Sequence, residues 1–150
     1  MYRILGQRVF ITAPAKWDRS LAEHSTAKEL VRIMGRVGQK RKTHIHAYCI
    51  MPNHIHVVIS AEEGGDLEGW LRYMKREAAK ALKAPGMWQR SYWDRRSRKS
   101  EDVVRMVAYT LNNPVRWRLC ERWDEWPFSW SQWHPQTRGA DPNVPEPTKE

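Results

Sequence analysis

The feature that most constrains the fold of this sequence is a pair of strand-like runs near the middle of the chain. The runs are Thr43–Met51 and His54–Ser60, and only the dipeptide Pro52-Asn53 separates them. Two apolar-rich runs joined by so short a turn are typical of a β-hairpin, or of something close to one. The centre of the chain therefore predicts two neighbouring antiparallel strands.

Strands and amphipathic helices alternate on both sides of this hairpin. Along the chain we predict a strand at Val9–Thr12, a helix from Leu21 to about Val37, the hairpin, a helix from Leu67 to Leu82, a strand from Met87 to Arg96, and a helix from Ser100 to Asn113 that stops before Pro114. The order β-α-β-β-α-β-α predicts an α+β fold. Specifically, it predicts a ferredoxin-like sandwich, with an antiparallel sheet and helices on one face.

The length of 150 residues fits one domain. The Trp-rich segment from Trp117 to Trp133 is expected to pack back on that domain. After it, four prolines occur among few apolar side chains, namely Pro135, Pro142, Pro145 and Pro147. We therefore predict a domain over residues 1–134 and a disordered, Pro-rich tail over residues 135–150.

The chain is strongly basic, with 26 Lys and Arg against 17 Asp and Glu, a formal net charge of +9, and nine Trp. Four basic residues spaced four apart form a stripe on the first predicted helix: Lys28, Arg32, Arg36 and Lys40. Phosphates bind Lys and Arg, and unpaired bases stack on aromatic rings, so this composition favours a nucleic-acid partner. Composition alone fits a basic protein with a Trp-rich core equally well.

The two cysteines, Cys49 and Cys120, show no zinc-knuckle spacing. Free thiols are the usual state in a reducing cytoplasm. The N-terminus has no signal-like apolar run, and no stretch approaches a membrane span. We expect a cytoplasmic, bacterial-type location without membrane contact, as either a monomer or a homodimer.

His54-Ile55-His56 is the sharpest local motif in the sequence. Alternate side chains of a strand point to the same side, so the two imidazoles share one face and Ile55 points to the other. Two His on one face can bind a divalent metal. The alternative is a pair of surface or packing histidines without a ligand.

The last predicted helix carries a reactive group at a suggestive position. At about 100° per residue, its apolar residues cluster in one arc, consisting of Val103, Val104, Val107, Ala108 and Leu111. Tyr109 falls roughly opposite this arc, and Asn113 lies one turn later on the same side as Tyr109. A tyrosine turned away from the core is available to react, and the Asn113 amide oxygen could bind a metal. The alternative is an ordinary solvent-facing tyrosine.

Three segments together resemble the REP-associated tyrosine transposases, a family of single-tyrosine HUH transposases. They read AYCIMPNHIHVVIS, WQRSYWDRRS and VAYTLNNPVRWRLCERWDEWPFSW, and the resemblance spans about Val9 to Trp133. It implies a ferredoxin-like HUH domain that acts on single-stranded DNA. It also implies that Tyr109 is the nucleophile and that His54, His56 and Asn113 are the metal ligands. His44 and His46 match no functional position of the family, and we interpret them as strand histidines.

The reaction that this resemblance implies is a transesterification through a 5′-phosphotyrosine intermediate on single-stranded or hairpin DNA. A divalent metal, Mg²⁺ or Mn²⁺, would assist by polarising the phosphate. The other tyrosines are Tyr2, Tyr48, Tyr73 and Tyr92. None of them combines a position away from the apolar arc of its helix, a candidate metal ligand one turn away and a place in the family motif.

We expect the DNA strand to contact the basic side of the second predicted helix and the aromatic, Arg-rich strand that follows. The candidate residues are Lys75, Arg76, Arg90, Arg95 and Arg96, with Trp88, Tyr92 or Trp93 available to stack bases. Two other functions remain open at this stage. One is a module that binds structured single strands without cutting them, and the other is a zinc hydrolase, which lacks carboxylates or cysteines at ligand spacing.

Overall fold

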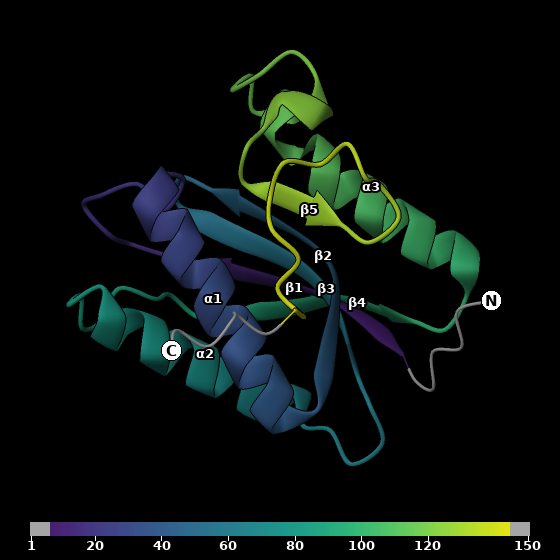
Figure 1. Cartoon of the computed structure of the whole chain (residues 1–150), viewed down its shortest axis with the longest axis horizontal. Coiled ribbons are helices and arrows are strands. Elements are labelled where there is room, and N and C mark those ends of the chain that lie inside the picture. Colours follow the sequence, from purple (N-terminus) through teal and green to yellow (C-terminus); the bar gives the residue numbers. More distant parts are fainter. Residues whose placement is uncertain (1–6, 145–150) are drawn as a thin grey trace, which may run out of the picture.

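The computed structural model describes residues 7–144, with the backbone alone at residues 92–95. Figure 1 shows the helices arranged around a single sheet. In chain order the elements are β1 (Arg8–Pro14), α1 (His24–Arg41), β2 (Thr43–Met51), β3 (His54–Ala61), α2 (Leu67–Ala81), β4 (Tyr92–Ser97), α3 (Ser100–Arg116), a 3₁₀ turn (Trp123–Glu125) and β5 (Ser129–Ser131). The predicted hairpin is confirmed as β2 and β3, with Met51 paired to His54 across the turn.

The sheet has the strand order β4-β1-β3-β2-β5, and every neighbouring pair is antiparallel. The first four strands follow the order of a ferredoxin-like sheet, so the predicted α+β fold is confirmed. The predicted Trp-rich segment supplies β5, which pairs with β2 through Tyr48 and Trp130. The strand predicted from Met87 to Arg96 is shorter than expected, because β4 begins only at Tyr92. Before it, Trp88 forms an isolated β-bridge with Ala15.

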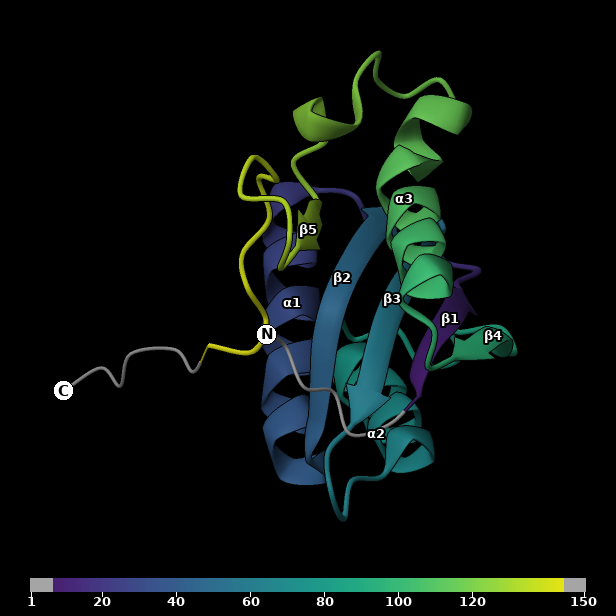
Figure 2. The same ribbon diagram turned by 90° about the vertical axis from the view of Figure 1, so that its right-hand side faces the viewer.

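The helices lie on both faces of the sheet, which corrects the prediction of helices on one face. α1 and α2 cover the face that carries Val9, Ile11 and Val57. α3 covers the opposite face through Phe10 and Val58 (Figure 2). The reason is that β1 and β3 carry apolar side chains on both of their sides, and each of these faces must be shielded from water.

α3 continues past Pro114 to Arg116, which corrects the prediction that it stops at Asn113. Pro114 lies in the last turn, where its missing N–H removes only one hydrogen bond. Beyond it, the Trp117 N–H donates to the Asn113 carbonyl at 3.1 Å and the Leu119 N–H donates to the Pro114 carbonyl at 2.8 Å. Because Asn113 and Pro114 are both buried, packing holds the helical path in place.

Residues 135–144 pack against the domain, so the prediction of a disordered tail from residue 135 is wrong for this stretch. The Asn143 side chain accepts from the Ile45 N–H at 3.0 Å and donates to the Ile45 carbonyl at 2.8 Å. The Tyr48 hydroxyl donates to the Ala140 carbonyl at 2.9 Å. These are polar and backbone contacts, which a search for apolar side chains does not detect. Residues 145–150 lie outside the described part of the chain.

Within residues 7–144, no helix is long and apolar enough to cross a membrane. Cys49 is a buried free thiol and Cys120 a half-buried one.

Candidate active site

The two histidines of β3 share one face of the strand, as their alternation predicts, and this face points toward α3. His56 is buried on the same face as Phe10, and their rings stack with centroids 5.1 Å apart. The Nε2 atoms of His54 and His56 lie 3.1 Å from each other. The pair is therefore a local cluster under the helix and is not exposed on an open sheet face.

Each imidazole is oriented by an oxygen at its other nitrogen. The His54 Nδ1 atom lies 2.7 Å from the Asn53 side-chain oxygen, and the His56 Nδ1 atom lies 3.1 Å from the Thr12 hydroxyl. Both oxygens can accept a hydrogen bond. The tautomer with protons on both Nδ1 atoms is therefore satisfied, and it leaves both Nε2 lone pairs for a ligand.

Asn113 of α3 completes this cluster from above. Its side chain is fully buried, and its amide nitrogen lies 3.0 Å from the His54 Nε2 atom. The nitrogen and oxygen of such an amide are assigned from their hydrogen bonds, and a rotation by 180° would exchange them. His54 and Asn113 are 59 positions apart in the sequence. The fold of β3 and α3 thus brings three polar side chains together, those of His54, His56 and Asn113.

Burial lowers the pKa of both histidines, with a smaller contribution from neighbouring positive charge. The pKa of His56 falls to about 3 because of desolvation first, and then because of His54 and Arg116. The pKa of His54 is also lowered, by desolvation and then by Arg116. Both rings are therefore neutral near pH 7, which is the form that binds a metal.

Tyr109 lies at the edge of the buried face of α3, beside the histidines. The predicted apolar arc needs a correction, because Val104 and Ala108 are exposed and the buried arc runs through Met106 and Thr110. This rotation moves Tyr109 from a position opposite the core to a position at its margin. Its ring contacts Phe10 and His56 edge-on, with centroids 5.5 and 5.9 Å away, while 44% of the residue stays exposed.

Arg116 is a site residue that the sequence reasoning missed. Its guanidinium donates to the Tyr109 hydroxyl at 2.9 Å and lies 4.1 Å above the centre of the Tyr109 ring. The same nitrogen is 3.5 Å from the Asn113 side-chain oxygen. Arg116 follows Tyr109 by seven positions and Asn113 by three, so on a continuous helix all three residues share one side. The sequence prediction ended the helix before Pro114 and therefore did not place Arg116 on that side.

These side chains line a shallow hollow of about 240 Å³. The histidine pair, Asn113, Tyr109 and Arg116 all line this hollow. Trp117, of which 62% is exposed, also lines it. The hollow thus combines a tyrosine hydroxyl, a guanidinium cation, two neutral imidazoles and an amide.

The two imidazole nitrogens and the amide oxygen could hold a divalent ion, and two imidazoles suit Mn²⁺ better than Mg²⁺. Among the residues that the structure describes, no three His, Cys, Asp or Glu side chains form a metal-type group. The set here is two imidazoles and one amide, and zinc sites usually add cysteine or a carboxylate. The zinc hydrolase alternative therefore gains no support from the geometry.

The model of the family described as "Transposase IS200 like" matches residues 7–106, from the start of the described chain to the middle of α3. The chain belongs to this transposase family. A REP-associated tyrosine transposase of Escherichia coli (strain K12) is 27% identical over 129 residues, covering 85% of this chain and 78% of the relative. A putative REP-associated tyrosine transposase of Haemophilus influenzae (strain ATCC 51907 / DSM 11121 / KW20 / Rd) is 25% identical, covering 65% and 68%.

A solved structure of a REP-associated tyrosine transposase bound to a REP hairpin has the same fold, with a TM-score of 0.75 and 27% identity. The match covers 86% of this chain and 79% of that one. The resemblance to REP-associated tyrosine transposases that the sequence predicts is confirmed by these comparisons. The alignments cover most of the transposase chain and are not limited to the histidine motif.

Two of the predicted DNA-contacting residues of this transposase have partners within the fold. The Lys75 ammonium donates to the Gln89 carbonyl and the Ser91 hydroxyl, at 3.0 and 3.1 Å. The Trp88 indole packs on the core and donates to the Lys75 carbonyl at 2.9 Å. These contacts favour a structural role for Lys75 and Trp88 over a role in DNA binding. Arg76, Arg90 and Arg96 are exposed and stay predictions, and the side chains of Tyr92, Trp93 and Arg95 lie outside the described part.

The competing tyrosines are poorly placed where the structure describes them. Tyr48 is buried, and burial raises the pKa of its hydroxyl far above the ordinary value. Tyr73 is half-buried under the Arg41 guanidinium, which lies 4.0 Å from the ring centre. Tyr2 and the Tyr92 side chain lie outside the described part. Neither Tyr48 nor Tyr73 lines the hollow that holds Tyr109.

His44 and His46 lie away from this hollow and hold β2 to the segment after β5. Both rings contact the Gln132 side-chain oxygen, at 3.0 Å for His44 and 2.9 Å for His46. His46 is buried, bonds the Ser60 hydroxyl at 2.8 Å and stacks on Trp133. These contacts favour a structural role for both histidines, in agreement with the prediction of strand histidines.

Proposed function

We propose that this transposase is a metal-dependent endonuclease and strand transferase for single-stranded DNA, with Tyr109 as the nucleophile. The observation that carries the proposal is the hollow itself. It brings the Tyr109 hydroxyl, the Arg116 guanidinium and the neutral His54–His56 pair together in one lining. Folding alone does not require Tyr109 and Arg116 to meet there, because both are exposed.

His54, His56 and Asn113 would hold the divalent ion, Mg²⁺ or Mn²⁺, through two imidazole nitrogens and the amide oxygen. The oxygens at both Nδ1 positions and the lowered pKa values of the histidines support this role. When bound, the ion supplies Lewis acidity to a phosphate oxygen.

In the proposed reaction, the phenolic oxygen of Tyr109 attacks the phosphorus of a DNA phosphodiester. The bond from phosphorus to the 3′ oxygen of the preceding nucleotide breaks. Tyr109 gives up its proton to solvent, the leaving oxygen takes up a proton to become a 3′-hydroxyl, and the 5′-phosphate stays on Tyr109. The number of phosphoester bonds is unchanged, so a 3′-hydroxyl can reverse the step without ATP.

The side chains around Tyr109 provide position and charge for this step. Arg116 donates to the phenolic oxygen and would use its further N–H groups to stabilise the charge that builds up on the phosphate under attack. Phe10 and His56 contact the ring edge-on and limit its rotation. The nucleophile is therefore held at the mouth of the hollow before DNA arrives, which lowers the entropic part of the barrier.

Hairpin DNA with single-stranded flanks is the proposed substrate. The support is the solved relative, which is described as bound to a REP hairpin and shares the fold at 27% identity. The exposed Arg76, Arg90 and Arg96 are the proposed phosphate contacts near the sheet edge. The protein would act as a monomer or a homodimer.

The test is to incubate the protein with labelled hairpin DNA that carries single-stranded flanks, with Mn²⁺ or with EDTA, and to run a denaturing gel. We expect a covalent protein–DNA band with Mn²⁺, and no such band with EDTA. His54→Ala should abolish the band, and the matched His44→Ala, from the neighbouring strand, should keep it. A wild-type protein that retains the DNA on a native gel without ever forming the covalent band would favour the non-cleaving binding module.

A further inference from the structure

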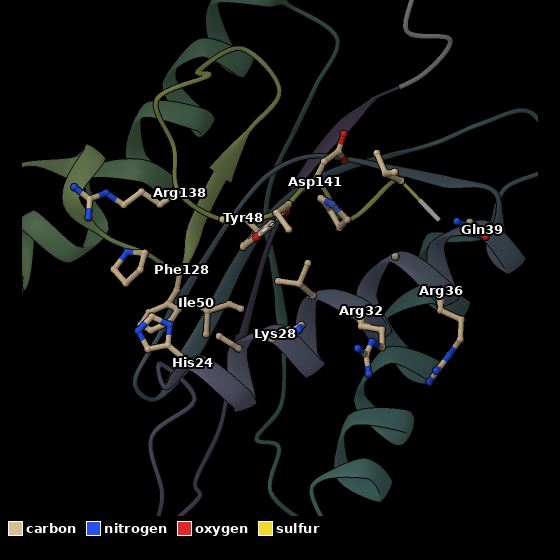
Figure 3. A pocket seen from close by; sticks show the side chains of 18 residues that line it. His24, Lys28, Arg32, Arg36, Gln39, Tyr48, Ile50, Phe128, Arg138 and Asp141 are labelled. Atoms are coloured by element: carbon tan, nitrogen blue, oxygen red, sulfur yellow. Dashed lines mark hydrogen bonds between the residues drawn. The ribbon is translucent and has the colours of Figure 1, made fainter. Parts of the chain in front are cut away.

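A second site lies on the face of the sheet opposite to the hollow, between α1 and the C-terminal segment. It is a groove of about 950 Å³. Figure 3 shows Lys28, Arg32 and Arg36 along α1, with Arg138 on the C-terminal segment across from the helix. Three of these residues belong to the basic stripe of the sequence, to which the proposed reaction gives no role. Lys40, the fourth residue of the stripe, does not line the groove.

The groove is positively charged. Its lining holds four Lys and Arg side chains and one carboxylate, Asp141, which accepts hydrogen bonds from the Asn143 backbone and side chain. Arg32 pairs with Glu29 at 3.1 Å and Arg36 pairs with Glu77 at 3.8 Å, both in exposed positions. Exposed pairs of this kind contribute little free energy, so a phosphate can compete for both arginines. Lys28 forms no ion pair with any residue in the described part of the chain.

The walls of the groove offer an aromatic surface beside the charges. Phe128 is half-buried on the core, and its ring meets the His24 ring at 5.1 Å between centroids. A basic track next to aromatic rings is the combination that single-stranded nucleic acid uses, because bases without a pairing partner can stack. Successive basic residues of the stripe are four positions apart, about 6 Å along the helix axis, a spacing comparable to that of neighbouring phosphates on one strand.

The groove and the hollow have lining residues on either side of the β2–β3 turn. Pro52, in this turn, accepts from the Leu21 N–H at 2.9 Å, just before α1. Ile50, two positions earlier, lines the groove and donates its N–H to the Phe128 carbonyl at 2.9 Å. Asn53 and His54, on the other side of the turn, line the hollow. The β2–β3 turn therefore lies between lining residues of the hollow and lining residues of the groove.

We propose that the groove between α1 and residues 138–144 binds single-stranded DNA, as the track for the flank that leaves the catalytic hollow. Lys28, Arg32, Arg36 and Arg138 contact its phosphates, and Phe128 and His24 provide the stacking surface. The site goes beyond the proposed reaction, since neither Tyr109 nor the metal ligands take part in it.

The test measures the affinity of a fluorescent oligothymidylate of about 20 nucleotides at several salt concentrations, in EDTA so that no cutting occurs. Removal of one phosphate-binding charge should reduce the slope of log affinity against log salt by about 0.7. We expect that reduction for Lys28→Gln and twice that reduction for Lys28→Gln/Arg36→Gln. The matched control is Lys40→Gln, on the same helix but outside the groove, and it should keep the wild-type slope.

A second readout locates the strand directly. Ultraviolet crosslinking of the same oligonucleotide carrying iododeoxyuridine should label the peptide that contains Phe128. Equal slopes for Lys28→Gln and Lys40→Gln, or crosslinks confined to α2 and β4, would overturn the proposal. So would a tighter interaction of the groove with blunt duplex than with the oligothymidylate. A protein that gives these slopes but never forms the covalent adduct would refute the proposed reaction while supporting the groove as a DNA site.

Discussion

At the scale of single residues, Arg116 links the parts of the candidate active site. It contacts the oxygen and the ring of Tyr109 and approaches the Asn113 amide oxygen. A guanidinium can donate to the attacking oxygen and keep further N–H groups for a phosphate, since it has five donors. Arg116 is therefore the residue whose replacement separates the chemistry from the fold.

Arg116→Gln should reduce the single-turnover rate of adduct formation about 100-fold, the usual effect of removing one preorganised donor at a developing charge. Thermal stability should change little, because the side chain is exposed. Arg105→Gln is the matched control, at an exposed arginine about three turns earlier on the same helix. An unchanged rate in Arg116→Gln, or an equal reduction in Arg105→Gln, would remove Arg116 from the mechanism.

At the scale of elements, the end of α3 carries local strain. Arg118 has a φ of 58°, in the left-handed region, and its N–H donates to the Val115 carbonyl at 3.0 Å. Together with the bond from the Leu119 N–H to the Pro114 carbonyl, this is the turn that commonly ends a helix and favours glycine. Any residue with a β-carbon adopts this conformation at a cost in free energy.

Arg118→Gly should therefore be more stable than Arg118→Ala by about 1 kcal/mol in the free energy of unfolding. Both variants remove the same side chain, so the comparison isolates the backbone conformation. Urea denaturation followed by circular dichroism measures the difference. If Arg118→Ala is as stable as Arg118→Gly, the left-handed turn at the end of α3 is not formed in solution.

The elements also mark where sequence reasoning succeeds. The hairpin and the shared face of His54 and His56 follow from the two-residue period of a strand, which no tertiary contact changes. The face of α3 does not follow from periodicity alone. Val104 and Ala108 are apolar yet exposed, while Thr110 and Asn113 are polar yet buried, because Thr110 bonds the Met106 carbonyl and Asn113 meets His54. The helix therefore has a different orientation from the one that hydrophobicity predicts.

At the scale of the whole molecule, the segment after β5 protects an open edge of the sheet. β5 pairs with Ala47, Tyr48 and Cys49 of β2 and leaves Ile45 without a strand on that side. The Asn143 side chain bonds both the N–H and the carbonyl of Ile45, which is buried. An amide that donates and accepts in this way replaces the missing strand pair. No pattern in residues 135–150 indicates this clamp, because it depends on one side chain and one backbone position 98 residues apart.

Asn143→Ala should lower the free energy of unfolding by about 1–3 kcal/mol, since it leaves a buried N–H and carbonyl unpaired. Asn112→Ala, at an exposed position of α3, should change it by less than about 0.5 kcal/mol. Deletion of residues 136–150 should be at least as destabilising as Asn143→Ala. An unchanged melting temperature in the deletion would show that the segment does not clamp β2 in solution.

The central claim is that Tyr109 is the nucleophile, and the most direct measurement is to map the tyrosine that carries DNA. The covalent adduct is formed with labelled hairpin DNA and Mn²⁺, digested with protease and nuclease, and analysed by mass spectrometry. We predict a nucleotide-modified peptide that contains Tyr109, and no adduct from Tyr109→Phe, which removes one oxygen and changes volume little. Tyr73→Phe, the matched control at a half-buried tyrosine, should form the adduct at the wild-type rate. A modified peptide containing Tyr48, Tyr73 or Tyr92, or an adduct from Tyr109→Phe, would contradict the account.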